Sequence, residues 1–478
     1  MTETFRLRFA PAPTGYLHLG SARAALFNWL YAQHLKSLGH DVEFVLRIED
    51  TDHERSQPEL IQLIFDVLTW LGITWDGEPV LQSTRTQRYL DAINGLLDRG
   101  VAYRCDCTQD AVRARAEARG EAGYDGFCRD RAVPSDSTHV VRFRAPDAGS
   151  TVFEDLIRGE VRFENSTIED FVLRRSDGSP VFLVANALDD AEMGITHVIR
   201  GEDLINVTPK VLMLRAALGF DAPLRFAHMP LIVNEQRKKL SKRRDDVSVG
   251  DYIERGFLPE AMVNYLALLG WGPTDGIEVR PLSEIIELFD IADVGQSSAM
   301  FDVKKLEAIN GDYIRAMSLD EFVELSLPYF ERVDWFERFD RERFEAIASE
   351  IQPRVKVLSD VPDVVEFLFI DEVAVDEASW AAAFVTNTFG ASTLRDAIEI
   401  FDAVDEPDWT TENLFAKSSE VMQRLVAAGG KKKLTQAPVR VAVTGRTVGP
   451  PLFDVMVVLG KAESMRRMRV GAQRAGLG

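Results

Sequence analysis

The chain has 478 residues, of which 46% are hydrophobic and 27% charged, and its net charge is −21. This length predicts roughly three domains, and this balance is that of an ordinary soluble globular protein rather than a disordered one. The net charge alone does not suggest a nucleic-acid partner, although it does not decide what a local groove can bind.

No run of 18 uncharged apolar residues occurs in the sequence, which therefore predicts no membrane span. The first residues also lack the apolar core of a signal peptide. The three cysteines are too few for a disulfide scaffold and suit a reducing compartment. We therefore expect a cytoplasmic protein that does not bind membranes.

The first elements alternate between strand and helix. Apolar and basic residues alternate over 5–9, which predicts a strand, and the Pro- and Gly-containing run at 10–15 ends it. A helix is expected from about Ser21, a second strand over 42–48 and an amphipathic helix over 60–71. This order predicts an α/β fold with a Rossmann-type parallel sheet.

The pattern changes near Cys105 and indicates an α+β insertion. The insertion is expected to hold a charged helix and several short strands, at 110–121 and at 139–144, 151–163 and 170–174 respectively. Sheet-like apolar runs return at 182–200 and 224–233, and from about Tyr252 the pattern is helical to the end. The expected domains are a Rossmann-type domain in two halves, the insertion and two helical domains, with boundaries at 1–104, 105–182, 183–246, 247–325 and 326–478.

A first candidate nucleotide motif lies between the first strand and the first helix. It reads Pro11-Ala12-Pro13-Thr14-Gly15-Tyr16-Leu17-His18-Leu19-Gly20-Ser21. Ligands of an open parallel sheet bind beside the carboxyl ends of its strands and the N-termini of its helices. Gly20 would let the backbone approach a nucleotide, and His18 could donate hydrogen bonds to phosphate oxygens. Taken alone, a capping or packing role is more common.

A second candidate motif, Lys239-Leu240-Ser241-Lys242-Arg243, follows the apolar run at 228–233. Two lysines three residues apart can reach one phosphate group and neutralise the charge that develops at a reacting phosphorus. A lone basic pentamer is usually a solvated surface. In one chain with the first motif, it predicts a nucleotide site.

Together the two motifs resemble those of the class I aminoacyl-tRNA synthetases, with Ser21 in place of a histidine. Three further segments are similar to the glutamate-specific branch of bacterial type: Arg47-Ile48-Glu49-Asp50-Thr51-Asp52, Val198-Ile199-Arg200-Gly201-Glu202-Asp203 and Ala442-Val443-Thr444-Gly445-Arg446. The resemblance extends from about Arg8 to about Arg467.

The resemblance implies that the chain activates L-glutamate with ATP and Mg²⁺, releases pyrophosphate and transfers glutamate to the 3′ end of tRNA(Glu). Such catalysis needs positioning and charge stabilisation, which we assign to His18, Lys239 and Lys242, and no protein nucleophile. The implied ATP site comprises Pro11, Gly15, His18, Gly20, Ser21, Lys239, Ser241, Lys242 and Arg243.

The resemblance also assigns tRNA contacts to three of the expected domains. The insertion would bind the acceptor stem, residues 247–325 would contact the stem, and residues 326–478 would bind the anticodon. The family is usually monomeric, and no DNA partner is expected. Whether tRNA(Gln) is also charged is left open by the sequence.

The expected amino-acid pocket lies at the strand ends. Alternation places Arg47 and Glu49 on one face at the end of the second strand, and Arg8 at the end of the first. Glutamate carries one ammonium and two carboxylates, so its pocket needs one anion and about two cations. The alternative is an Arg–Glu ion pair that braces the strand ends.

By resemblance, Glu49 holds the ammonium, Arg200 the α-carboxylate and Arg8 the side-chain carboxylate, with Asn186 assisting. Two further pocket positions, Ala12 and Phe182, stand where the family usually has a serine and a tyrosine. Both lack a hydroxyl that could bind substrate, which weakens discrimination between similar amino acids.

All three cysteines lie within residues 105–128, which suggests a zinc site. Zinc is held by four thiolate, imidazole or carboxylate ligands in a tetrahedron. Cys105, Cys107, Cys128 and Asp130 would supply them, with Tyr124 as a rival fourth ligand. The alternative is three ordinary thiols, since a Cys-x-Cys pair with one further cysteine is a loose pattern.

Three other functions compete with this one. The shortened enzyme that glutamylates a modified base lacks an anticodon-binding domain, whereas a long segment follows Ser326 here. Glutaminyl-tRNA synthetases usually end in β-barrels, and this tail is expected to be helical. A catalytically inactive tRNA-binding relative is disfavoured because His18, Lys239 and Lys242 are all present.

Overall fold

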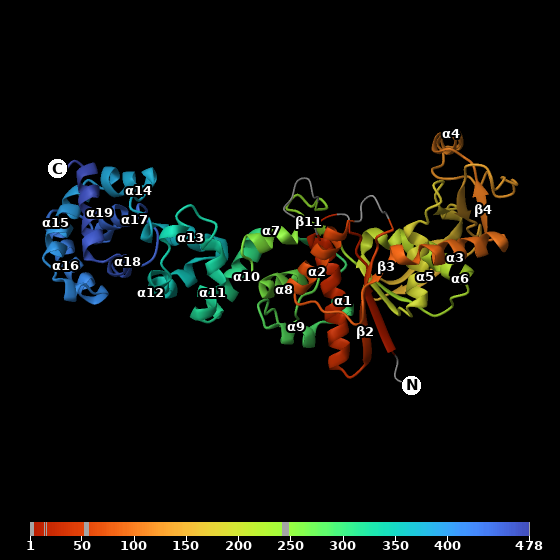
Figure 1. The fold of residues 1–478 in the computed structure, drawn as a ribbon, viewed down its shortest axis with the longest axis horizontal. Coiled ribbons are helices and arrows are strands. Elements are labelled where there is room, and N and C mark those ends of the chain that lie inside the picture. Colours follow the sequence, from red (N-terminus) through yellow and green to blue (C-terminus); the bar gives the residue numbers. More distant parts are fainter. Residues whose placement is uncertain (1–3, 14, 16, 52–56, 241–247, 478) are drawn as a thin grey trace. The chain divides into compact units, whose positions relative to one another are not determined.

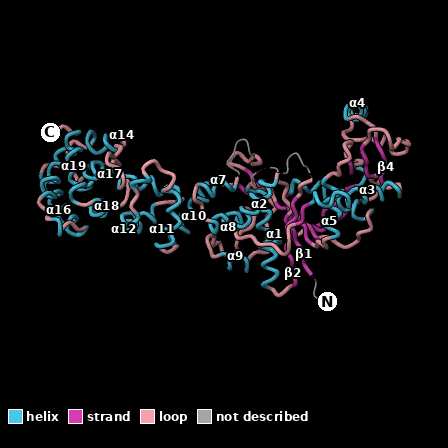
Figure 2. Tube along the Cα trace, in the orientation of Figure 1, coloured by secondary structure: helices cyan, strands magenta, loops and turns pink. Residues whose placement is uncertain are grey.

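The computed structural model describes residues 4–13, 15, 17–51, 57–240 and 248–477. The chain forms two compact units (Figure 1). The first contains the residues up to Ile253 together with Pro259–Leu306, and the second contains Glu254–Leu258 and the residues from Glu307 onward. Figure 2 shows that the strands gather in the first unit and that helices make up the second.

A seven-stranded sheet forms the centre of the first unit, in the order β3-β2-β1-β9-β10-β6-β7. Neighbouring strands from β3 to β6 pair in parallel, and β7 pairs antiparallel with β6 at one edge. The strands are β1 (Thr4–Phe9), β2 (Asp41–Ile48), β3 (Val80–Leu81), β6 (Ser150–Asp155), β7 (Gly159–Glu164), β9 (His197–Gly201) and β10 (Arg225–Met229).

The strand order reverses direction between β1 and β9. From β1 the chain proceeds outward to β2 and β3, whereas β9 and β10 extend the sheet on the other side. Such a switch point opens a crevice at the carboxyl ends of the strands, where ligands bind. Helix α1 (Leu19–Ser37), which begins just after β1, packs against β1, β2 and β9.

Other helices of the first unit pack around this sheet or beside it. Helix α5 contacts α3 and α6, while α8 and α9 pack on α1. These helices and two others, α2 and α7, have the following bounds: α2 (Pro58–Trp70), α3 (Thr86–Asp98), α5 (Phe182–Glu192), α6 (Thr208–Ala217), α7 (Val249–Glu254), α8 (Pro259–Leu268) and α9 (Leu282–Leu288). A short parallel pair, β11 (Ile232–Val233) and β12 (Ala299–Met300), lies apart from the main sheet.

A three-stranded antiparallel sheet belongs to the inserted segment. It consists of β4 (Ala102–Cys105), β5 (Val140–Phe143) and β8 (Val172–Arg174), with β5 in the middle. Helix α4 (Gln109–Arg119) begins where the Thr108 hydroxyl accepts a hydrogen bond from the amide of Ala111, at 3.2 Å. Gly120 follows the last helical residue, and its φ of 68° is favoured by glycine.

The second unit is built from helices over the residues that the structure describes. Helix α10 (Val303–Ala316) leads into it, and α15, α17 and α19 pack against one another. The remaining bounds are α11 (Leu319–Phe330), α12 (Arg341–Ile351), α13 (Val361–Val365), α14 (Glu377–Trp380), α15 (Gly390–Asp402), α16 (Thr411–Ala427), α17 (Gln436–Thr444), α18 (Leu452–Leu459) and α19 (Lys461–Arg474). None of the described helices is long and apolar enough to cross a bilayer.

The predicted fold class, a parallel-sheet α/β core with a helical C-terminal region, is confirmed. Two local predictions were wrong. The apolar run at 182–192 is helix α5, because a buried helix and a buried strand give the same continuous apolar pattern. The strands expected at 151–163 are β6 and β7, and they extend the main sheet instead of the small sheet of the insertion.

Candidate active site

A cavity of about 460 Å³ opens at the carboxyl ends of β1 and β9, beside the N-terminus of α1. It brings together residues that lie far apart in the sequence. The predicted site residues that line it are Arg8, Pro11, Ala12, His18, Gly20, Ser21, Glu49, Phe182, Asn186, Arg200 and Lys239. Gly15 does not line it, and the predicted Ser241, Lys242 and Arg243 lie outside the described residues.

Helix α1 begins within the first motif, at Leu19. His18 is its N-cap, and the imidazole Nδ1 accepts a hydrogen bond from the amide of Ser21 at 3.2 Å. A Cβ atom on Gly20 would lie 3.1 Å from the His18 ring, so glycine leaves room for the imidazole. The amides of a helix N-terminus favour an anionic group. This corner of the cavity is therefore suited to phosphate.

The second motif enters the same cavity through Lys239. Its ammonium lies 2.8 Å from the Asp203 carboxylate, and both side chains are about half exposed. An ion pair this exposed contributes little to stability, so the lysine can turn to a phosphate without a large loss.

Arg8 pairs with a buried carboxylate, Asp190, which was not predicted from the sequence. The guanidinium Nε lies 3.3 Å from Asp190, and Arg8 is 4% exposed. Asp190 also pairs with Nη1 of Arg47, at 2.7 Å. Burial acts to raise the pKa of Asp190, but Arg47 and Arg8 together lower that pKa to about 2. The alternative partner for Arg8, Glu49, is thus not the residue that holds it.

Glu49 faces the cavity through a different set of contacts. Its carboxylate accepts a hydrogen bond from the Asn186 amide at 2.6 Å, and the Asn186 oxygen accepts one from Arg47 at 3.1 Å. Arg47 itself is fully buried. Burial raises the pKa of Glu49, which Arg47 opposes. A bound ammonium group would favour the ionised carboxylate further.

Arg200 is a buried cation whose direct partners are neutral. It is 8% exposed and donates to the Thr208 hydroxyl at 2.7 Å, to His228 Nε2 at 3.2 Å and to the Leu204 carbonyl at 3.3 Å. Burial lowers the pKa of Arg200 to about 10, so it remains charged at neutral pH. A buried cation without a carboxylate contact among the described residues is suited to an anionic ligand.

Helix α5 supplies most of what the sequence analysis missed. Asn186 and Asp190 are four residues apart, so they lie on one face of this helix. The neighbouring Asp189 is fully buried and accepts hydrogen bonds from Gln82, Arg85 and Tyr89, at 2.9, 2.8 and 2.8 Å. The only signal for this network was the spacing of the polar residues, which has meaning once the segment is known to be helical.

The three cysteines lie together in the insertion. Their sulfur atoms are all within 4.8 Å of one another, and those of Cys107 and Cys128 are 3.4 Å apart. The Tyr124 hydroxyl lies 3.4 Å from the sulfur of Cys105. Asp130, the predicted fourth ligand, is instead exposed and pairs with Arg144 at 3.1 Å. Its carboxylate is not part of the group, because the side chain points to the surface.

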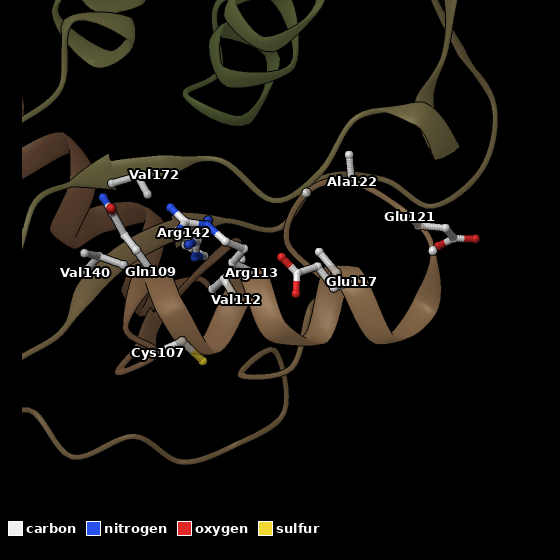
Figure 3. Close-up of a pocket in the computed structure, with 13 residues that line it drawn as sticks. Cys107, Gln109, Val112, Arg113, Glu117, Glu121, Ala122, Val140, Arg142 and Val172 are labelled. Carbon is white, nitrogen blue, oxygen red and sulfur yellow. The ribbon is translucent and has the colours of Figure 1, made fainter.

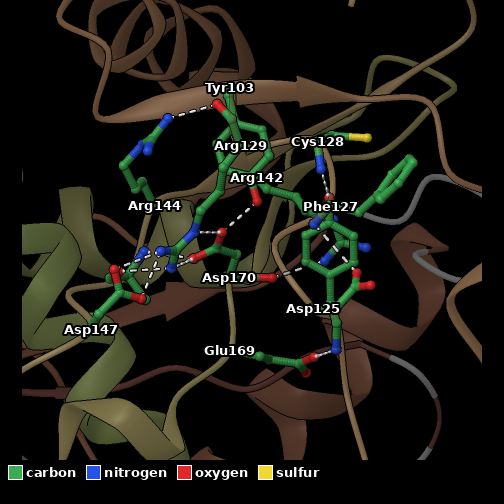
Figure 4. Close-up of polar contacts among 12 residues, drawn as sticks. Tyr103, Asp125, Phe127, Cys128, Arg129, Arg142, Arg144, Asp147, Glu169 and Asp170 are labelled. Carbon is green, nitrogen blue, oxygen red and sulfur yellow. Dashed lines mark hydrogen bonds and ion pairs between the residues drawn. The ribbon is translucent and has the colours of Figure 1, made fainter. Parts of the chain in front are cut away.

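A polar network fixes the loop that carries Cys128 (Figure 4). Arg129 pairs with the buried Asp170 at 2.6 Å and with Asp147 at 2.6 Å. Asp170 also accepts a hydrogen bond from the Tyr103 hydroxyl. These contacts hold the residue next to Cys128 in one position and so help to keep the thiols close together.

A second cavity, of about 610 Å³, lies in the insertion between α4 and the sheet (Figure 3). Arg113, Glu117 and Arg142 line it, together with Cys107 at one end. It is larger than the cavity at the ends of β1 and β9, but it contains no residue of either nucleotide motif. The chemistry of its lining therefore favours the smaller cavity as the active site.

Comparisons with known proteins show the family to which the chain belongs. The family described as tRNA synthetases class I (E and Q), catalytic domain, matches residues 4–308, and the anticodon binding domain family matches residues 321–472. A glutamate–tRNA ligase of Frankia casuarinae is 49% identical over 98% of this chain and 98% of its own. One of Thermobifida fusca is 47% identical over 99% of this chain and 98% of its own.

A solved structure extends the similarity to the fold. The crystal structure of a glutamate tRNA ligase from Elizabethkingia meningosepticum, in complex with its amino acid, matches with a TM-score of 0.82 and 30% identity. The match covers 98% of this chain and 99% of that one. The family predicted from the sequence is confirmed. The chain belongs to the glutamate–tRNA ligases, within the class I tRNA synthetases.

Proposed function

We propose that the cavity at the ends of β1 and β9 binds glutamate and ATP, and that the chain attaches glutamate to the 3′ end of tRNA(Glu). One observation carries this proposal. Two buried arginines, Arg8 and Arg200, and one half-buried carboxylate, Glu49, line the same cavity as the start of helix α1. This set matches the two carboxylates and one ammonium of glutamate.

In the first step, an oxygen of the glutamate α-carboxylate attacks the α-phosphorus of ATP. The new P–O bond forms as the bond to the β-phosphate breaks, and pyrophosphate leaves. Arg200 holds the α-carboxylate, while His18 and Lys239 stabilise charge on the phosphate oxygens. Lys242 joins them by its place in the second motif. Mg²⁺, when bound with ATP, neutralises part of the phosphate charge.

In the second step, a ribose hydroxyl at the tRNA 3′ end attacks the acyl carbon. The acyl–phosphate bond breaks, AMP leaves, and the hydroxyl proton passes to solvent. We propose that residues 105–182 contact the acceptor stem, residues 247–325 the stem beyond it, and residues 326–478 the anticodon. The match of 321–472 to an anticodon binding domain supports the last of these assignments.

ATP–pyrophosphate exchange in the presence of tRNA(Glu) tests this function. Exchange should depend on glutamate and should be much weaker with glutamine or aspartate. Exchange that depends on glutamine would instead support a glutaminyl enzyme. Binding of tRNA(Glu) without any exchange would identify an inactive relative. Charging assays with separate tRNA(Glu) and tRNA(Gln) transcripts then decide whether both are substrates.

We also propose that the cysteine group holds one Zn²⁺ with Tyr124 as the fourth ligand. Tetrahedral zinc with thiolate ligands places its sulfur atoms roughly 3.8 Å apart, which is compatible with three sulfurs within 4.8 Å of one another. The Tyr124 hydroxyl next to Cys105 supports it over Asp130. The ion would cross-link the insertion, which lies far along the chain from both nucleotide motifs.

Elemental analysis of protein purified without chelator should find about one zinc per chain. Cys107→Ser should lose the metal and leave adenylation in the first unit largely intact. Tyr124→Phe should weaken zinc binding, whereas its matched control Asp130→Asn should not. Absence of stoichiometric zinc would contradict the proposal, and loss of zinc only in Asp130→Asn would restore Asp130 as the ligand.

Sedimentation would show whether the chain is monomeric, as we propose.

A further inference from the structure

Two buried residues stand directly behind Arg200 and have no role in the proposed reaction. Asp155 ends strand β6, His228 lies on β10, and Arg200 lies on β9, so the three occupy adjacent parallel strands. His228 is in register with Arg200. Asp155 and His228 are 1% and 0% exposed, so neither can reach a substrate itself.

The position of Asp155 determines which nitrogen of His228 carries the proton. His228 Nδ1 lies 2.6 Å from the Asp155 carboxylate, which can only accept hydrogen bonds when ionised. Burial acts to raise the pKa of Asp155, but its hydrogen bonds with His228 and with the amides of Ile157 and Arg158 lower that pKa overall. Nδ1 therefore donates its hydrogen to Asp155. The Nε–H of Arg200 faces Nε2 and can only donate, so Nε2 keeps its lone pair and the ring is neutral. Burial, which lowers the pKa of His228 against the opposing effect of Asp155, favours the same state.

Arg200 donates a hydrogen bond to this lone pair. Arg200 Nε–H donates to His228 Nε2 at 3.2 Å, and Nη2 donates to the Thr208 hydroxyl at 2.7 Å. The Thr208 oxygen itself lies 3.0 Å from His228 Nε2, so its hydroxyl can donate to the same nitrogen. Among the described residues, the hydrogen bonds of Arg200 use Nε and Nη2, and the residue lines the cavity. The remaining nitrogen, Nη1, is left for a ligand.

We propose that Asp155 and His228 are positioning residues: Asp155 fixes the His228 tautomer, and His228 Nε2 holds the Arg200 guanidinium in the orientation in which Nη1 receives the glutamate α-carboxylate. This inference rests on the proposed function. A guanidinium N–H donates well to a carboxylate only when the plane of the guanidinium is correctly oriented. Second-layer hydrogen bonds that fix a histidine tautomer set orientation in this way at other sites.

The competing role is purely structural, because the same contacts also join β6, β9 and β10. A structural role predicts that substitutions lower stability and weaken every ligand of the cavity alike. A positioning role predicts a selective loss that is confined to the α-carboxylate. The test must therefore compare glutamate with a ligand that has the other two charged groups but no α-carboxylate. That probe is 4-aminobutyrate.

Two substitutions of His228 separate its contacts. In His228→Asn, the shorter amide can still donate to Asp155 but has no acceptor near Arg200. In His228→Gln, the longer side chain can place its oxygen where Nε2 was and accept from Arg200. Asp155→Asn provides an independent variant. Its amide can donate to Nδ1, which moves the ring hydrogen to Nε2 and sets it against the Arg200 N–H.

For each variant, the KM for glutamate, the KM for ATP and kcat are measured by pyrophosphate exchange. The inhibition constant of 4-aminobutyrate is measured alongside them, and thermal melts follow folding. His228→Asn and Asp155→Asn should raise the glutamate KM about 10-fold or more, the scale of one hydrogen bond to a charged group. The KM for ATP and the inhibition constant of 4-aminobutyrate should stay within about twofold. His228→Gln should recover most of the glutamate affinity.

An unchanged glutamate KM in both His228→Asn and Asp155→Asn would overturn the inference. So would a parallel rise in the inhibition constant of 4-aminobutyrate, or an equal defect in His228→Gln and His228→Asn. If His228→Asn does not fold, Asp155→Asn decides by the same ratio of constants. Failure of the proposed function is a different result, because the unmodified protein would then show no glutamate-dependent exchange at all.

Discussion

Replacing Arg8 with glutamine tests which charge of the cavity selects glutamate over glutamine. Arg8 is 4% exposed, and its only described carboxylate partner, Asp190, keeps a second arginine, Arg47, at 2.7 Å. The variant should therefore fold. Without Arg8, the side-chain carboxylate of glutamate enters a partly buried position without its cation, and losing one partner of such a pair costs roughly 3 kcal/mol. That corresponds to about a 100-fold loss in kcat/KM.

The assay measures kcat/KM for glutamate and for glutamine in tRNA charging, together with the KM for ATP and a thermal melt. Arg8→Gln should shrink the preference for glutamate by about the factor calculated above and leave ATP binding nearly unchanged. Arg6→Gln is the matched control. Arg6 lies two residues earlier on β1 and donates to the Met193 carbonyl at 2.6 Å, outside the cavity. If Arg8→Gln lowers the melting temperature but keeps the preference, Arg8 is a structural partner of Asp190 and the reasoning is refuted.

Three further expectations concern the phosphate site and the buried charges. Lys242→Ala should slow adenylation by about 100-fold while glutamate binding changes little, which pre-steady-state measurement of adenylate formation checks. Gly20→Ala should also slow adenylation, because its Cβ would press on the His18 ring at 3.1 Å; an unchanged rate would remove that contact from the mechanism. The pKa of Asp190 is lowered from 3.8 to about 2 in the folded chain. The ionised carboxylate therefore adds about 2 kcal/mol to the free energy of unfolding above pH 4, and this contribution is lost as the pH falls toward 2. Urea unfolding across that range should show a shallower loss in Asp190→Asn than in the unmodified protein.

The motifs made the parallel sheet and the family predictable from the sequence. Alternation over 5–9 and 42–48 located two neighbouring strands, and the glycine- and proline-containing loop after the first marked the ligand-binding edge. The structure places Arg8, Glu49, Asn186 and Arg200 around one cavity. Their individual roles remain predictions that the substitutions above would test.

Local sequence patterns could not predict the buried partners of these residues. Helix α5 is buried over most of its length, from Leu183 to Asp190, so it lacks the polar stripe that distinguishes a helix from a strand. Reading it as sheet-like concealed that Asn186 and Asp190 share a face. Asp155 and His228 are 73 residues apart, and only the parallel pairing of their strands brings them together. Such a contact follows from topology, which periodicity does not supply.

The double pairing of Asp190 has an evolutionary consequence. Its carboxylate holds one arginine that lines the cavity and another that is fully buried, so a mutation there would affect the proposed glutamate site and the folded core together. A variant that lost this carboxylate would leave a buried cation uncompensated and would be degraded more readily in the cell. Mutant copies with relaxed amino-acid choice would thus be scarce before they could misacylate much tRNA. Under the proposed function, protein turnover would thus limit misacylation by mutants at this position.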